Sequence, residues 1–145
     1  MTHSNAGHYA AKHGQGGQPD EKIAAAIRGK ALNGELGCAE AEATGAGFGA
    51  TLAEVGRTMD LLEIRIGRCQ LGLFGYDTPG GRIVQPAETV APELEAKIRG
   101  GLADGRLPCR TAWEIAAGLR LPRMKVSSAC EALNIRIKPC QLGAF

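Results

Sequence analysis

Apolar residues over 92–103 recur at the spacing of a helix. Leu94, Ile98 and Leu102 would lie on one helical face, and the acidic residues of the first turn favour the positive end of the helix dipole. Asp104-Gly105 follows this segment, and Asn33-Gly34 follows a similar one earlier in the chain. A glycine just past a helix favours a left-handed cap, so both dipeptides are predicted to end helices.

Two more helices are predicted after this one. Thr111 and Glu114 form the Thr-x-x-Glu pattern of a capping box, so a helix should run over about 112–119. Pro122 suits the first position of a third helix, over about 122–133, because its missing N–H would have no partner there. Apolar spacing predicts that the inner face of the third helix is Val126, Ala129, Cys130 and Leu133, and that Arg123, Lys125, Ser127 and Ser128 face solvent.

The remaining segments of this region are predicted to be extended. Residues 135–138 alternate apolar and basic side chains, which is the period of a half-buried strand, and 141–145 can return beside them as a hairpin. Leu107-Pro108-Cys109 is too short for anything but an edge strand or an extended connector.

The chain contains an internal repeat. Residues 23–74 align with 94–145 at a constant offset of 71 without a gap, and 20 of the 52 pairs are identical. The ends of the copies match best, because a Cys-Gln-Leu-Gly-x-Phe segment closes both of them, at 69–74 and at 140–145. The chain is therefore a duplicated module.

The repeat divides the chain into four segments. We expect a flexible tail at 1–20, a first repeat at 21–76, a linker at 77–92 and a second repeat at 93–145. The tail carries histidines at a spacing that matches no helix or strand face, namely His3, His8 and His13. Modules this small are marginal alone, so the copies should pack on each other within one chain or form a homodimer.

The predicted order of elements in each repeat is helix, short extended piece, helix, turn, helix and hairpin. This order resembles a winged helix-turn-helix domain, with the Ile-Arg-Ile…Cys-Gln-Leu-Gly-x-Phe segment in the place of the wing. The resemblance covers nearly all of both copies and implies a mainly α, α+β fold of two tandem modules. The hairpin is short and its tip has few basic residues, which is a departure from a wing that grips DNA.

The distribution of charge, more than its sum, separates the two copies. The formal net charge is only +2. Residues 21–76 carry six Lys or Arg against seven Asp or Glu, whereas residues 93–145 carry nine against five. The resemblance implies that the third helix of the second copy contacts base edges while surrounding cations and hydroxyls hold phosphates. The candidate DNA-binding residues are Arg110, Arg120, Arg123, Lys125, Ser127, Ser128, Arg136 and Lys138.

These observations leave three hypotheses open. The first is a transcription-regulator-like protein that binds double-stranded DNA through its second copy. The second is a protein-interaction or assembly module, since the first copy has Glu54 where the second has Lys125 and looks adapted to another task. A solvated basic face without a nucleic-acid partner is the alternative explanation of the charges.

The third hypothesis is a thiol-based metal or redox sensor. Four of the five cysteines form two matched pairs, each 31 residues apart, at Cys38 with Cys69 and Cys109 with Cys140. No Cys-x-x-Cys pair is present, so a zinc site would need all four thiols together. Because cysteine is also among the most buried residue types, core packing is the preferred interpretation of these thiols.

The sequence lacks the signatures of an enzyme. No histidine lies outside the tail, and Gly45, Gly47 and Gly49 lack the preceding strand and the Lys-Ser/Thr of a phosphate loop. We therefore expect no catalytic residue and no cofactor. The chain also lacks an apolar run long enough to span a bilayer and the residue order of a secretory signal, so we expect a cytoplasmic protein without a membrane partner.

Overall fold

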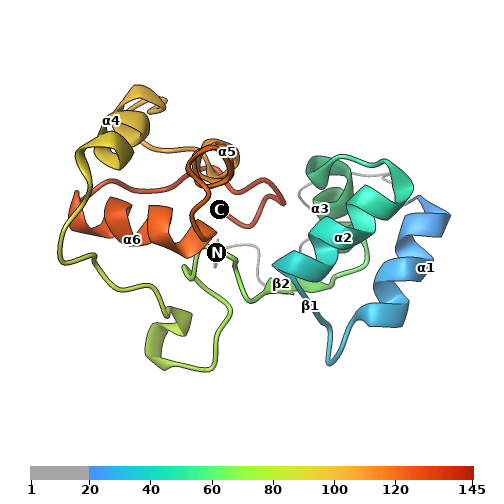
Figure 1. Ribbon diagram of the computed structural model, residues 1–145. Helices are drawn as coiled ribbons and strands as arrows, with labels where there is room; N and C mark the ends of the chain where they lie inside the picture. The colour runs from blue at the N-terminus through green and yellow to red at the C-terminus, as the bar shows by residue number, and fades with distance from the viewer. Residues whose placement is uncertain (1–19) are drawn as a thin grey trace. The chain divides into compact units, whose positions relative to one another are not determined.

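The computed structural model describes residues 20–145, which form two compact units (Figure 1). Unit 1 extends to Cys69 and also includes Gln141–Phe145, whereas unit 2 is Gln70–Cys140. The units therefore differ from the repeats at both ends. The two units exchange the segments that end the repeats. Residues 70–74 end repeat 1 but belong to unit 2, and residues 141–145 end repeat 2 but belong to unit 1. The expected tail at 1–20, with its three histidines, lies almost wholly outside the described residues.

The described residues of unit 1 form three helices and a two-stranded sheet. Asp20 caps the first helix, because its Oδ1 accepts hydrogen bonds from the backbone N–H groups of Lys22 and Ile23 at 2.9 and 3.1 Å. The sheet pairs two three-residue strands in parallel. The elements are α1 (Glu21–Lys30), β1 (Glu35–Gly37), α2 (Cys38–Phe48), α3 (Leu52–Leu61) and β2 (Arg65–Gly67).

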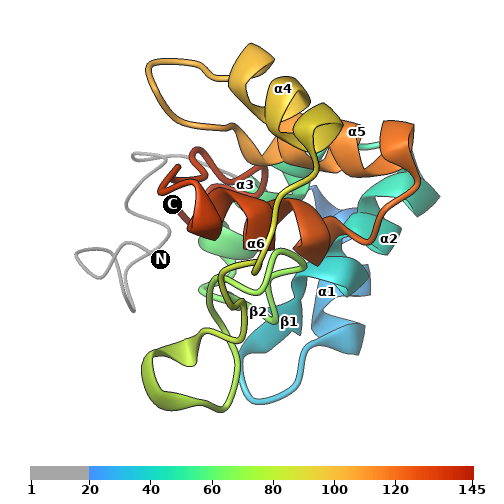
Figure 2. The same ribbon diagram turned by 60° about the vertical axis from the view of Figure 1, so that its left-hand side comes forward.

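Unit 2 repeats this order of elements with a single bridge in place of the sheet. Leu107 pairs in parallel with Ile137, at the positions that Leu36 and Ile66 hold in unit 1. The elements of unit 2 are the 3-10 turn η3 (Pro79–Gly81), α4 (Pro92–Gly100), α5 (Cys109–Leu119) and α6 (Arg123–Ala132). Residues 71–87, which lie between β2 and α4 in sequence, run beside α6 (Figure 2).

The expected hairpin is wrong, although the expected alternation is present. Ile137 is buried between exposed Arg136 and Lys138, as the pattern predicts. Its partner is Leu107, however, and not the segment 141–145, which belongs to unit 1. The mainly helical α+β class is confirmed by six α-helices and a small parallel sheet in the described part of the chain.

Two local predictions about helix ends are also wrong. Asn33-Gly34 and Asp104-Gly105 do not cap helices, because α1 ends at Lys30 and α4 at Gly100. Both dipeptides instead have positive φ at each residue and connect antiparallel bridges in a two-residue turn. Asn-Gly and Asp-Gly are the preferred sequences for this type of turn.

The capping box lies in the first repeat and not in the second. Because Pro108 precedes the first residue of α5, Thr111 is already inside the helix and cannot cap it. At the start of α3, Thr51 Oγ1 accepts from the Glu54 N–H at 3.1 Å and donates to Glu54 Oε1 at 3.3 Å. The third helix of repeat 2 agrees with the prediction, since α6 spans Arg123–Ala132.

The cores of the two units use matching positions of the repeat. The third helix supplies fully buried residues in each unit, Val55 and Met59 in α3 and Val126 and Cys130 in α6. Most of the predicted inner face of α6 is confirmed, with Leu133 half-buried at its end. Further buried residues are Ile23, Ile27, Leu36 and Ile66 in unit 1, and Leu94, Ile98, Leu107, Ala112, Ala129 and Ile137 in unit 2.

Candidate functional site

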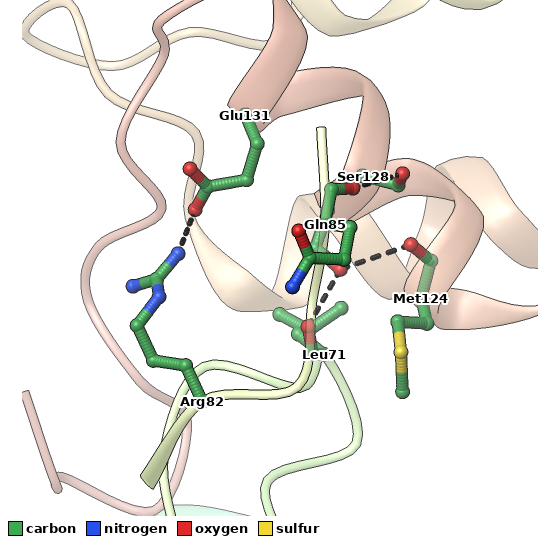
Figure 3. Close-up of polar contacts among 7 residues, drawn as sticks. Leu71, Arg82, Gln85, Met124, Ser128 and Glu131 are labelled. Atoms are coloured by element: carbon green, nitrogen blue, oxygen red, sulfur yellow. Dashed lines mark hydrogen bonds and ion pairs between the residues drawn. The ribbon is translucent and has the colours of Figure 1, made fainter. Parts of the chain in front are cut away.

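The third helix of each unit holds the Gln-Leu-Gly-x-Phe segment that comes from the other repeat. In unit 2, Ser127 Oγ donates to the Leu71 carbonyl at 2.6 Å and lies 3.1 Å from the Met124 carbonyl (Figure 3). In unit 1, Gly56 takes the place of Ser127, and a Cβ built on it would lie 2.0 Å from the Leu142 carbonyl oxygen. Leu71 and Leu142 are themselves equivalent in the repeat. The two segments therefore occupy the same site on α6 and α3.

Residues 71–87, which we call the strap, continue across α6. Ser128 Oγ donates to the Gln85 carbonyl at 2.5 Å, and the Ala87 N–H donates to the Ser128 carbonyl at 3.0 Å. Arg82 forms an ion pair with Glu131 one turn further along the helix (Figure 3). Only Lys125 and Ala132 of α6 remain exposed. The strap therefore covers much of the surface that a recognition helix would present to DNA.

Arg123 also has intramolecular partners. Its guanidinium stacks 3.6 Å from the centre of the Trp113 ring, and Nη1 donates to Gln70 Oε1 at 2.9 Å. The expectation that Arg123, Ser127 and Ser128 face solvent is wrong, because Ser127 is fully buried and the other two are half-buried. The physical reason is the strap for Ser127 and Ser128, and the contacts with Trp113 and Gln70 for Arg123. The periodicity of α6 alone indicates neither.

The other five candidate DNA-binding residues are exposed: Arg110, Arg120, Lys125, Arg136 and Lys138. Arg136 and Lys138 flank buried Ile137 and therefore extend from the outer side of the Leu107–Ile137 pair. The adjacent Arg106 is exposed as well. We call Arg106, Arg136 and Lys138 the basic edge. Within residues 20–145, none of these three side chains has a hydrogen-bond or ion-pair partner.

The basic edge replaces an ion pair of the first repeat. In unit 1, Arg65 Nε lies 3.2 Å from Glu35 Oε1 across the paired strands, and the Glu35 side chain also covers Gly67. The equivalent positions in unit 2 are the three cations of the basic edge. Sequence reasoning missed Arg106, although the alignment of the two repeats carries the signal as an exchange of Glu35 for Arg106.

Arg120 occupies a backbone conformation that disfavours most side chains. It ends α5 with φ of 56°, whereas repeat 1 has Gly49 at this position with φ of 64°. A left-handed residue with a Cβ costs about 1–2 kcal/mol relative to glycine. The second repeat therefore keeps a long exposed cation where a glycine would stabilise the fold.

The matched cysteines lie in two separate pairs. All five cysteines are thiols, and unit 1 holds Cys38 and Cys69 while unit 2 holds Cys109 and Cys140. In the described part of the chain, no group of three or more His, Cys, Asp or Glu side chains could hold a metal ion. The four-thiol cluster considered from the sequence is therefore not formed by these residues.

Cys130, which has no counterpart in repeat 1, is a core residue of α6. It is 1% exposed, and burial together with the neighbouring charge of Glu131 raises the pKa of its thiol from 9.0 to about 12. The neutral thiol is therefore the form that fits the folded protein.

This shift predicts a loss of stability at alkaline pH. The unfolded chain releases the Cys130 proton near pH 9 and the folded chain does not, so the free energy of unfolding should fall by up to about 1.4 kcal/mol per pH unit above pH 9 and below pH 12. Denaturant titrations at pH 8 and pH 10 measure this slope. Cys130→Ala should have a shallower slope over the same interval, and equal slopes in the two proteins would contradict the shift.

No helix among residues 20–145 is both long and apolar enough to cross a membrane. The comparisons with known proteins give no relative of this chain, because no family model, no curated protein and no solved structure matches it significantly.

Proposed function

We propose that the protein binds double-stranded DNA through unit 2, as a transcription-regulator-like protein built from two winged-helix-like repeats. The observation that carries this proposal is the basic edge. Three cations stand together without an acidic partner, at positions where the first repeat neutralises its own charge with Glu35 and Arg65. Unpaired Lys and Arg side chains on one surface are the usual means of contacting DNA phosphates.

Neighbouring residues extend this surface. The Cys109 N–H donates to the Pro139 carbonyl at 3.1 Å, so α5 begins directly beside the basic edge. Arg110 in the first turn of α5 is 79% exposed, and its 3.6 Å pair with Glu114 is too long and too solvated to hold it firmly. At the equivalent place in unit 1, Arg68 forms an ion pair with Glu40 at 2.5 Å. The matching residues of unit 2 are Pro139 and Thr111, which carry no charge.

Arg120 supports the same proposal from the turn between α5 and α6. A side chain kept in an unfavourable backbone conformation suggests a role outside folding. Lys125, in the first turn of α6, is exposed as well. The proposal therefore assigns phosphate contacts to the basic edge, Arg110 and the turn. It assigns no base contact to Arg123, Ser127 or Ser128, because they hold the strap and the Gln70–Phe74 segment.

A single charge reversal tests the proposal. Arg106→Glu would restore the ion pair of repeat 1 with Arg136 and so remove two cations from the surface. We expect weaker binding to a random-sequence DNA duplex, and a dependence of log K on log salt that is shallower by about 2. Fluorescence anisotropy over a salt series measures both. Lys22→Glu on exposed α1 of unit 1 is the matched control, since it changes net charge equally and should leave the slope unchanged.

Arg120→Gly separates DNA contact from folding. It introduces the residue that repeat 1 uses at the same φ, so thermal stability should rise while DNA affinity falls. Wild-type protein that shows no binding to duplex DNA at low salt would overturn the proposal. Binding that Arg106→Glu and Lys22→Glu weaken equally would overturn the assignment to unit 2.

A protein-docking role is the second candidate. Two large apolar side chains of unit 1 face solvent, Leu32 at 77% exposure and Phe48 at 47%. Monomeric proteins tolerate single exposed apolar residues, so this observation is weaker than the basic edge. Docking would be favoured if the wild-type protein fails to bind DNA and Arg106→Glu leaves its self-association unchanged.

A further inference from the structure

Cys109 and Cys140 lie just after the paired residues Leu107 and Ile137, on neighbouring backbone segments. In the bridge between Leu107 and Ile137, the Leu107 N–H donates to the carbonyl of Arg136, the residue before its partner. The Cys109 N–H donates in the same way to the carbonyl of Pro139, the residue before Cys140, at 3.1 Å. The hydrogen-bond pattern therefore continues past the bridge, with one additional residue on the second segment.

This pairing suits a disulfide bond. Paired strands lie roughly 5 Å apart, and disulfides join residues whose Cα atoms are about 4.4–6.8 Å apart. The burial pattern puts both cysteines on the inner face: Leu107 and Cys109 are buried, and the exposed residues Lys138 and Pro139 separate buried Ile137 from half-buried Cys140. The repeat places Cys38 and Cys69 at the equivalent positions of unit 1, after β1 and after β2.

The two thiols differ in access and in environment. Cys140 is half-buried, whereas Cys109 is only 5% exposed. Cys109 is also the first residue of α5, whereas Cys140 lies outside any helix or strand. Cys140 can therefore meet a dissolved oxidant first, and Cys109 can attack it afterwards.

We propose that Cys109 and Cys140 form a reversible disulfide with low-molecular-weight disulfides, such as oxidised glutathione, as the oxidant. The Cys140 thiolate attacks one sulfur of the oxidant, its S–S bond breaks, and one glutathione thiolate leaves. Cys109 then loses its proton and attacks the Cys140 sulfur of the mixed disulfide, which releases the second glutathione. Two protein thiols are oxidised, one oxidised glutathione is reduced to two glutathiones, and the two thiol protons pass to the thiolates that leave.

The bond would fix the start of α5 to the segment that carries Arg136 and Lys138. The chemistry rests on the backbone pairing alone and does not depend on DNA binding. Unit 1 should react more slowly at the matching pair, because Cys38 and Cys69 are 7% and 6% exposed.

Peptide mapping of the intact chain tests the proposal. Native protein is treated with oxidised glutathione, unfolded in the presence of an alkylating agent that blocks every free thiol, and digested with trypsin, which does not cleave the Lys138–Pro139 bond. We expect peptide 107–110 linked to peptide 137–145, two hydrogens lighter than the reduced peptides together. The number of reactive thiols should fall from five by two before the pair of unit 1 reacts. Cys130, buried in α6, should stay reduced and serves as the internal control.

Two variants complete the experiment. In Cys109→Ser, Cys140 should stop at the mixed disulfide and carry one glutathione, and in Cys140→Ser, Cys109 should stay reduced in the folded protein. A wild-type Cys140 that carries glutathione without ever linking to Cys109 would overturn the proposal. So would linkage of Cys140 to Cys130 or to a second chain in place of Cys109.

Discussion

Leu142→Ala should destabilise unit 1 by about 2–5 kcal/mol, although residue 142 lies in the second repeat. Leu142 is 2% exposed, and its carbonyl lies directly against Gly56 of α3. Removing the side chain would leave a cavity over α3 in unit 1 and would not affect the core around α6. Hydrogen exchange measured by mass spectrometry should therefore show faster exchange in Leu52–Leu61 and little change in Arg123–Ala132.

The matched variant, Leu71→Ala, should give the opposite pattern. Leu71 is fully buried in unit 2, where its carbonyl accepts the hydrogen bond of Ser127. Its loss should increase exchange in α6 and spare α3. The exchange of the two segments would be wrong if Leu142→Ala increased exchange in α6 and Leu71→Ala increased it in α3.

Gly56→Ala should cost about 1–3 kcal/mol of unfolding free energy, even though alanine is the better helix former. A Cβ at this position would overlap the Leu142 carbonyl at 2.0 Å and displace the 141–145 segment. Gly47→Ala in α2 is the control, because a Cβ there meets no atom within 4 Å. It should raise stability by up to about 1 kcal/mol. Thermal or denaturant unfolding distinguishes the two results.

If Gly56→Ala and Gly47→Ala stabilised the protein equally, the Leu142 carbonyl would not contact α3 at Gly56 in solution. Destabilisation by both would instead point to a general intolerance of helix substitution, and Gly118→Ala in α5, also without a neighbour within 4 Å, would resolve that case.

The helices were predictable because their signals are local. Proline before α6 and apolar spacing along it placed the helix within a residue or so of its observed bounds. Asn33-Gly34 misled the prediction because the same two residues suit both a helix end and a two-residue turn, and only the pairing of Leu32 with Glu35 decides between them. Local signals thus located the helices better than their ends.

The candidate site was predictable in its charges and not in its geometry. Arg136 and Lys138 were identified from alternation beside Ile137, and the structure places both on the exposed side. The burial of Ser127 depends on Leu71, which is 56 residues away in sequence. No periodicity carries information over that distance. The identity of Leu71 and Leu142 in the repeat showed that the segment matters, without showing which helix receives it.

The exchange of segments also sets the order in which the chain can fold during synthesis. When residue 69 has been made, α3 exists in sequence, but the segment that covers it is still 72 codons from being read. At translation rates of about 5–20 residues per second, that delay is roughly 4–14 s. The apolar surface of α3 around Leu142's site is uncovered throughout this time. Unit 1, although most of it is made first, is therefore completed last, because it needs residues 141–145 whereas unit 2 ends at Cys140.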